Sequence, residues 1–346
     1  MGSIPSEVLS AYGFDLKGLE QQSFGSGLIN HTWKLKSSKG DFILQTINQN
    51  VFPFPEMIDQ NIEAVGDFLS LNYPSYFFVH PIKTSDSKSM FYFDHKYYRL
   101  FPYVIGSHAK TVVENASEAF EAAKQFGIFT KLLSEFETNK LQNTLPDFHN
   151  LALRYHQFEE ALISGDAYRI ADSRQIIQQL IDNRGIVKTY QSILTNPDFK
   201  MRVTHHDTKI SNVLFDENNK GICVIDLDTL MPGFFISDVG DMMRTYLCPV
   251  SEEEKDFDKI NIRSEIYRAI VRGYADAMGD ELSATEIQYF FYAAQFMIYM
   301  QALRFLTDHL NSDRYYGAKY EGQNFVRAAN QMKLLEKLLE NESVLK

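Results

Sequence analysis

The sequence lacks the features that mark several classes of protein. Its 346 residues include two cysteines, Cys223 and Cys248, whose spacing fits neither a metal site nor a disulfide framework. Acidic residues outnumber basic ones by 45 to 34, and the net charge of −11 argues against binding to a nucleic-acid backbone. No basic stretch followed by an apolar core opens the chain, so we expect no signal peptide. These absences favour a cytoplasmic protein with reduced thiols, and they leave its oligomeric state open.

Long hydrophobic runs are also scarce. One stretch, residues 287–306, has the length of a membrane span, but it contains Gln288, Gln295, Gln301 and Arg304. We therefore expect a buried helix within a large domain and no membrane partner. Apolar residues make up 45% of the chain, which is enough to build a substantial core.

Short strands are predicted in the first hundred residues. Residues 32–38 and 41–47 are β-branched or aromatic runs joined by a Lys-Gly turn, a pattern typical of a hairpin. Residues 56–71 have the apolar spacing of an amphipathic helix, and residues 89–101 alternate as a strand or hairpin does. Pro102 then interrupts this pattern.

Helices are predicted beyond that point. Helical spacing of apolar residues recurs over 114–134, 172–194, 259–278, 284–310 and 321–345. The exception is 201–230, where the short strands MRV, VLF and ICVI are set around polar loops. We therefore predict an α+β protein with a small β-rich lobe in residues 1–102 and a larger, mainly α-helical lobe in residues 103–346.

The segment THHDTKISN, residues 204–212, gathers several reactive groups in one loop. It offers Asp207, Lys209 and Asn212, and the later segment VIDLDT adds Asp226. If VLF and ICVI pair as a hairpin, its open end brings Asn212 close to Asp226. An amide oxygen beside a carboxylate suits Mg²⁺, which keeps waters and is shared with a substrate phosphate.

Phosphoryl transfer needs parts of this kind. Asp207 would orient an acceptor hydroxyl and take its proton, and Lys209 would contact the transferred phosphate. Asn212 and Asp226 would hold Mg²⁺, while His205 would support the catalytic loop. The pattern resembles the His-Arg-Asp loop and Asp-Phe-Gly segment of protein kinases.

These segments resemble the aminoglycoside phosphotransferase and choline kinase superfamily, which shares the two-lobed protein-kinase fold. The resemblance implies that residues 1–102 form the nucleotide-binding lobe and residues 103–346 the catalytic and substrate-binding lobe. HDTKISN, VIDLDT and the later MQALRFLTDHLNSDRYYG are similar to segments of N-acetylhexosamine 1-kinases within that group. The resemblance implies an ATP- and Mg²⁺-dependent kinase acting on the anomeric C1 hydroxyl of N-acetylglucosamine or N-acetylgalactosamine. It implies sugar contacts from Asp207, Asp228, Arg304 and Tyr315. The structural alternative is that Arg304 pairs with Asp308 and that Tyr315 packs inside the lobe.

Two further segments are predicted to bind the nucleotide. Gly25, Ser26 and Gly27 lie between strand-like runs, where a glycine hairpin lets backbone N–H groups approach phosphates. In the hinge, the Pro102 carbonyl and the Val104 N–H are two residues apart and would receive adenine.

One position departs from the kinase pattern. Kinases place a lysine on the next strand to bind phosphates and pair with a helix glutamate, whereas this chain has Gln45. We expect Gln45 to contact phosphate as a neutral donor, which leaves Glu63 without a role. The hexosamine kinases resemble this chain in lacking that lysine.

Two other functions stay open on the sequence alone. The first is a kinase for a cationic acceptor such as choline or an aminoglycoside, which the acidic charge favours slightly. The second is a pseudokinase that binds nucleotide without turnover, suggested by the missing lysine.

Overall fold

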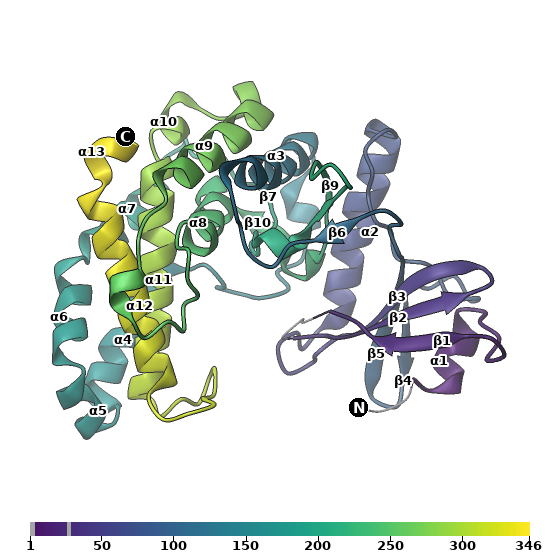
Figure 1. The fold of residues 1–346 in the computed structure, drawn as a ribbon, viewed down its shortest axis with the longest axis horizontal. Coiled ribbons are helices and arrows are strands. Elements are labelled where there is room, and N and C mark those ends of the chain that lie inside the picture. The colour runs from purple at the N-terminus through teal and green to yellow at the C-terminus, as the bar shows by residue number, and fades with distance from the viewer. Residues whose placement is uncertain (1–3, 26–28) are drawn as a thin grey trace.

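The computed structural model describes residues 4–25 and 29–346, and these form two lobes (Figure 1). The predicted phosphate-loop residues Ser26 and Gly27 lie outside the described residues. The small lobe is an antiparallel sheet of order β1-β2-β3-β5-β4 with two helices. Its elements are α1 (Ser6–Ala11), β1 (Glu20–Ser23), β2 (His31–Ser37), β3 (Gly40–Thr46), α2 (Pro55–Asn72), β4 (Met90–Phe93) and β5 (Lys96–Pro102).

Both predicted hairpins of the small lobe are confirmed. β2 pairs with β3 and β4 with β5, each antiparallel. The sheet has its own apolar core, in which Leu35, Leu44 and Leu100 pack with Val8 and Leu9 of α1. The small lobe therefore has a packed interior separate from that of the large lobe.

Helix α2 joins the two lobes. Its apolar side chains, including Ile58, Ile62 and Val65, belong to the core of the large lobe rather than to that of the sheet. Between them, the buried Asn61 amide donates to the carbonyls of Gln142 at 2.8 Å and Leu230 at 2.9 Å. Helix α2 stands between the sheet and the helical lobe in Figure 1, where these contacts hold it.

The large lobe is mainly helical. Its helices are α3 (Ala116–Leu132), α4 (Leu151–Ser164), α5 (Ala167–Asp172), α6 (Arg174–Asp182), α7 (Gly185–Ile193), α8 (Phe235–Tyr246), α9 (Ser264–Met278), α10 (Ala284–Ile287), α11 (Phe290–Leu310), α12 (Gln323–Glu340) and α13 (Glu342–Leu345). The central α11 packs against α12, α8 and α4 and is buried along most of its length. It contains most of the apolar stretch 287–306, as expected. Among the described residues, no helix is both long and apolar enough to cross a membrane.

Five short strands lie within the large lobe. They are β6 (His108–Ala109), β7 (Arg202–Thr204), β8 (Val213–Phe215), β9 (Gly221–Val224) and β10 (Met231–Gly233). β8 and β9 form the predicted hairpin, with Val213 opposite Val224, and β6 pairs with the outer side of β8. The loop predicted to carry the chemistry therefore leads directly into a sheet.

Some helices differ from the prediction. The run 172–194 is two helices, because the Asn183 side chain donates to the Gln179 carbonyl at the end of α6 and Gly185 then begins α7. The run 284–310 likewise breaks between α10 and α11. Helix α8 was not predicted, although Phe235, Ile236, Val239, Met242 and Met243 have the apolar spacing of a helix. Unlike most amphipathic helices, it also buries the acids of its polar side, Asp238 and Asp241.

A buried ion pair ties α10 to the strand that precedes the catalytic loop. The Arg202 guanidinium of β7 donates to both oxygens of Glu286, at 2.6 and 2.9 Å, and the two side chains are 3% and 0% exposed. Glu286 also accepts from the backbone N–H groups of Ser283 and Lys200. Both carboxylate oxygens of Glu286 thus accept two hydrogen bonds each.

We predict that Glu286→Gln strongly destabilises the protein. The change leaves the Arg202 charge buried without a counter-charge, which costs about 3–5 kcal/mol of unfolding free energy. Urea unfolding followed by circular dichroism measures this loss. The control is Glu340→Gln, which removes an exposed pair with Lys337 on α12 and should not move the midpoint. Equal midpoints for both variants would contradict the prediction.

Candidate active site

Two buried carboxylates of α8 fix the loop that contains Asp207. Asp238 accepts from the backbone N–H groups of His205 at 3.0 Å and His206 at 2.8 Å. Asp241 accepts from the Thr208 N–H at 2.9 Å. Buried carboxylates are costly unless they are paired or hydrogen-bonded, so these bonds define one conformation of the loop. Both residues therefore anchor the loop.

His205 has the supporting position predicted for it. Its side chain is buried, and its Nε2 lies 2.9 Å from the carbonyl oxygen of Ile225, next to Asp226. Its own carbonyl accepts from the Thr229 hydroxyl at 2.6 Å. The residue therefore connects the catalytic loop to the segment that follows β9.

Asp207, Lys209 and Asn212 lie together. The Lys209 ammonium is 2.7 Å from Oδ2 of Asp207. The Asn212 amide nitrogen donates to the same oxygen at 3.0 Å and to the Asp207 carbonyl at 2.8 Å. Since the amide nitrogen faces Asp207, the amide oxygen of Asn212 remains as an acceptor.

Asp226 joins this group at the open end of the β8–β9 hairpin. The Ile225 N–H donates to the Asn212 carbonyl at 2.9 Å, which continues the pairing to the residue before Asp226. The Asp226 carboxylate lies 4.0 Å from the Lys209 ammonium, which also pairs with Asp207 at 2.7 Å. The backbone of Asp226 is left-handed, with a φ of 63°. The four predicted residues thus converge on one point.

The charges at this point are unbalanced. Burial and the neighbouring Asp228 and Asp207 raise the pKa of Asp226 to about 7. Burial would also raise the pKa of Asp207, but Lys209, His205 and Asn212 outweigh it and hold that pKa below its usual value. A site of this kind favours an additional cation next to Asp226.

The residues fit a magnesium ion that is shared with a substrate. Across the described ranges, no three His, Cys, Asp or Glu side chains converge as a complete metal cage. Mg²⁺ commonly takes one or two protein oxygens and completes its shell with waters and phosphates. The Asn212 amide oxygen and the Asp226 carboxylate supply such a pair.

Asp228 meets the small lobe. One of its oxygens is 2.6 Å from the Arg99 guanidinium of β5, and the other accepts from the Asn30 amide at 2.7 Å. Neither Arg99 nor Asn30 was singled out from the sequence. A charged residue at an inward position of a strand, as in KYYRLF, was the signal that could have found Arg99. Contact between Asp228 and an acceptor stays a prediction.

The other residues predicted to bind the nucleotide belong to the small lobe and to the segment that follows it. Gly25 has a φ of 77°, a left-handed conformation that glycine adopts without strain. Gln45 is half-buried on β3, and its amide contacts both Thr32 and Arg99. Pro102 ends β5, and the Val104 carbonyl accepts from Ser107. Adenine contacts by Pro102 and Val104 stay predictions.

Arg304 and Tyr315 lie beside each other on the acceptor side. Arg304, on α11, donates from Nη2 to the Tyr315 hydroxyl at 3.3 Å. Asp308 instead accepts from the backbone N–H groups of Tyr315 and Tyr316, so the expected alternative pairing of Arg304 with Asp308 is wrong. Tyr315 is 70% exposed rather than packed in the lobe.

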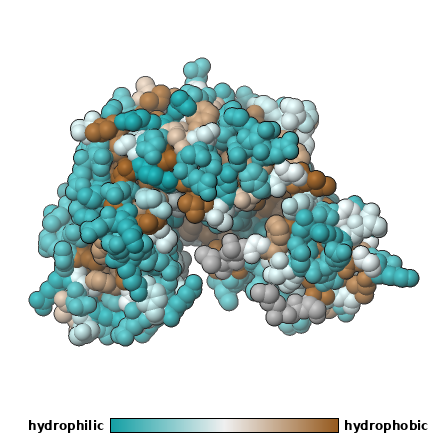
Figure 2. Space-filling view, viewed as in Figure 1, coloured by the Kyte–Doolittle hydropathy of each residue, from teal (hydrophilic) through white to brown (hydrophobic). Residues whose placement is uncertain are grey.

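A row of side chains connects Arg304 to the catalytic loop. The guanidinium lies 5.4 Å from the ring centre of Phe148, which stacks on His149 at 4.4 Å. The His149 ring is 5.2 Å from that of His206, the residue before Asp207. The loop between α11 and α12 is on the side of the helical lobe that faces the small lobe, and the surface is hollowed between the lobes (Figures 1 and 2).

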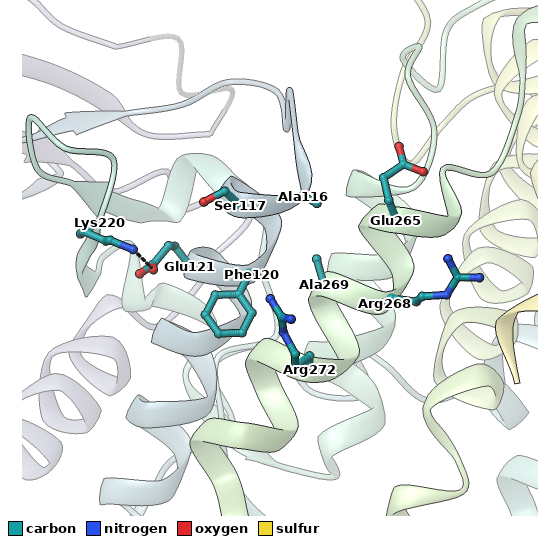
Figure 3. A pocket seen from close by; sticks show the side chains of 9 residues that line it. All are labelled: Ala116, Ser117, Phe120, Glu121, Lys220, Glu265, Arg268, Ala269 and Arg272. Atoms are coloured by element: carbon teal, nitrogen blue, oxygen red, sulfur yellow. Dashed lines mark hydrogen bonds and ion pairs between the residues drawn. The ribbon is translucent and has the colours of Figure 1, made fainter.

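A separate pocket of about 810 Å³ lies between α3 and α9. In Figure 3, Phe120 of α3 and Arg272 of α9 lie close to each other between the two helices, whereas Glu121 points toward Lys220 and Arg268 points away from α3. Lys220, at the turn end of the β8–β9 hairpin, closes one side through a 2.8 Å pair with Glu121. None of the predicted site residues lines this pocket, since Asn212 and Asp226 are at the hairpin's opposite end.

Comparison with known proteins agrees with the fold. A spectinomycin phosphotransferase in complex with ADP and spectinomycin is 12% identical, with a TM-score of 0.60 over 97% of this chain and 96% of that one. A microcompartment-associated aminopropanol kinase is 14% identical, with a TM-score of 0.65 over 98% and 96%. Choline kinase from Cryptosporidium parvum is 14% identical, with a TM-score of 0.57 over 96% and 92%.

The fold and the site define a kinase-like phosphotransferase. The model of the phosphotransferase enzyme family known as APH matches residues 20–274, and this chain belongs to that family. The predicted superfamily, the two-lobed α+β fold and the phosphotransferase class are confirmed. The N-acetylhexosamine subgroup stays a prediction, as does the division of the lobes at residue 102.

We predict that Asp207→Asn lowers turnover by ~10²–10⁴-fold, the range for loss of a general base. The amide keeps the shape of the side chain but cannot take a proton, so nucleotide affinity should change little. ADP release in a coupled assay measures turnover, and calorimetry measures nucleotide binding. Near-wild-type turnover would remove Asp207 from its assigned role.

Proposed function

We propose that this protein is an ATP- and Mg²⁺-dependent kinase of the cytoplasm that phosphorylates the anomeric hydroxyl of N-acetylglucosamine or N-acetylgalactosamine. The convergence of Asp207, Lys209, Asn212 and Asp226 carries the kinase part of the proposal. The arrangement around Arg304 carries the acceptor part.

Each residue of the catalytic loop has a task in this reaction. Asp207 stays ionised at neutral pH because its pKa is held low, so it can orient the sugar hydroxyl and accept its proton. The Lys209 ammonium is near both Asp207 and Asp226, and we assign it to stabilise the negative charge of the transferred phosphoryl group. Asn212 and Asp226 would hold Mg²⁺, which neutralises the phosphates when bound.

The acceptor side is positively charged. Burial lowers the pKa of His149, and the nearby charges of His206, Arg304, Arg244 and Arg154 lower it further. Arg304 likewise lowers the pKa of Arg154, after burial. Such surroundings repel a cation, whereas a neutral sugar can accept hydrogen bonds from the arginine and from the Tyr315 hydroxyl.

A cationic acceptor is the competing proposal. The structural likeness to choline and aminopropanol kinases favours it, as does the acidic net charge. The arginines beside Phe148 argue against it. A pseudokinase is disfavoured by the intact set Asp207, Asn212 and Asp226.

We predict ADP release with N-acetylhexosamines and not with choline, aminopropanol or an aminoglycoside. The assay contains ATP, one acceptor at a time, and either Mg²⁺ or EDTA, and release should require Mg²⁺. Turnover with choline alone would establish the competing proposal. A chain that binds ATP but releases no ADP with any acceptor would be a pseudokinase.

We predict that Arg304→Ala lowers kcat/KM for the sugar by ~10–150-fold, while the KM for ATP is nearly unchanged. Loss of a hydrogen bond to a charged donor typically costs ~1.5–3 kcal/mol. Arg314→Ala is the control, because it removes an arginine from the same loop region and should leave both parameters as they are. Parallel losses for sugar and ATP would show that Arg304 is structural.

A further inference from the structure

Gln45, which stands where kinases have the strand lysine, has the positively charged Arg99 beside it. Gln45 of β3 is paired across the sheet with Arg99 of β5. Cross-strand partners point to the same face of a sheet, and here the Arg99 Nε donates to the Gln45 side-chain oxygen at 3.1 Å. The neutral residue at the lysine position thus holds an arginine supplied by the neighbouring strand.

The partner of this arginine is not on helix α2. Glu63, the acid that a strand lysine would meet there, forms an exposed pair with Lys83 at 3.1 Å. Arg99 instead pairs with Asp228 of the large lobe at 2.6 Å, and the two side chains are only 3% and 4% exposed. Kinases pair a strand lysine with a helix glutamate inside the small lobe, whereas here Arg99 of the small lobe pairs with Asp228 of the large lobe.

Asp228, which pairs with the guanidinium, lies close in the chain to Asp226, the carboxylate predicted to bind the metal. It follows Asp226 by two residues in a single turn of 3₁₀ helix, and Asn30 holds its second oxygen at 2.7 Å. Asn30 in turn accepts from the Asn48 N–H at 3.0 Å, at the end of β3.

The terminal nitrogens of the guanidinium remain available to a ligand. The Nε donates to Gln45, whereas one terminal nitrogen lies 2.6 Å from Asp228 as an ion pair, and within residues 4–25 and 29–346 neither terminal nitrogen forms a hydrogen bond. Burial of an ion pair seldom stabilises a protein more than apolar packing does, so stability alone does not account for Arg99 here. An arginine fork is well suited to phosphate oxygens.

We propose that Arg99 is the phosphate-binding cation of the small lobe. Its guanidinium, positioned by Gln45 and Asp228, binds the phosphates of the nucleotide beside Asp226 and replaces the strand lysine. This inference rests on the proposed use of ATP but not on the identity of the acceptor. Because Asp228 belongs to the large lobe, the cation is in place only when the two lobes are together.

The test compares nucleotides that differ in phosphate. Calorimetry with Mg²⁺ and no acceptor gives the Kd values of ADP and adenosine for the wild type and for Arg99→Met. The variant should bind ADP about 10- to 150-fold more weakly, the effect of losing a charged hydrogen bond, and adenosine equally well. Equal ADP affinity, or equal losses for both ligands, would overturn the proposal.

Two further variants separate charge from stability. Adding Gln45→Lys to Arg99→Met restores a cation on β3 and should recover ADP affinity, which a purely structural role for Arg99 would not allow. If Arg99→Met does not fold, Arg99→Lys replaces it and should weaken ADP by a smaller factor, again without affecting adenosine.

A matched control is Arg169→Met, which breaks a 2.6 Å pair with Asp313 in the large lobe and should leave both Kd values unchanged. A wild-type protein that binds neither ligand would refute the proposed function itself, and this outcome is distinct from wild-type binding that survives loss of Arg99.

Discussion

The burial of two carboxylates beneath the catalytic loop is the constraint on which the rest of the site depends. Asp238 and Asp241 of α8 accept backbone N–H groups from three of the four residues 205–208. The Thr208 hydroxyl returns a bond to the Asp238 carbonyl at 2.7 Å, and the Tyr246 hydroxyl donates to the Thr208 carbonyl. Such polar groups are satisfied inside the protein only in this arrangement, so the direction of Asp207 follows from the packing of α8.

That packing in turn depends on small and apolar neighbours. Gly240 lies so close to α11 that an added Cβ would be 2.5 Å from the Ala293 carbonyl. Val239, Met242 and Met243 are completely buried around it. The chemistry at the surface of the cleft is thus supported by the close approach of α8 to the central helix α11.

The second level of organisation is the contact between lobes. Asn61 of α2 donates to two carbonyls of the large lobe, and Asp228 forms an ion pair with Arg99 and accepts a hydrogen bond from Asn30. These contacts place the end of the sheet against the loop of Asp226. Around the sheet the contacts between the lobes are polar, whereas helix α2 is held to the large lobe by apolar packing as well.

Sequence reasoning predicted the residues that cluster locally and missed those that meet across the fold. Asp207, Lys209 and Asn212 lie within six residues, and hairpin geometry alone brings Asp226 to them. Arg99 and Asn30 meet Asp228 from about 130 and 200 residues away, and no local pattern encodes that contact. Helix α8 does have helical spacing of its apolar residues, and it was missed because only its acids Asp238 and Asp241 were considered, as loop anchors.

The most direct test of the proposed function is the chemical form of its product. Phosphorus NMR of a reaction with ATP, Mg²⁺ and N-acetylglucosamine reports which hydroxyl received the phosphate. The proposed function predicts a phosphate signal coupled to the single anomeric proton and lost on mild acid treatment, as expected of a sugar 1-phosphate. An acid-stable signal coupled to the two protons of a CH₂ group, or inorganic phosphate alone, would contradict it.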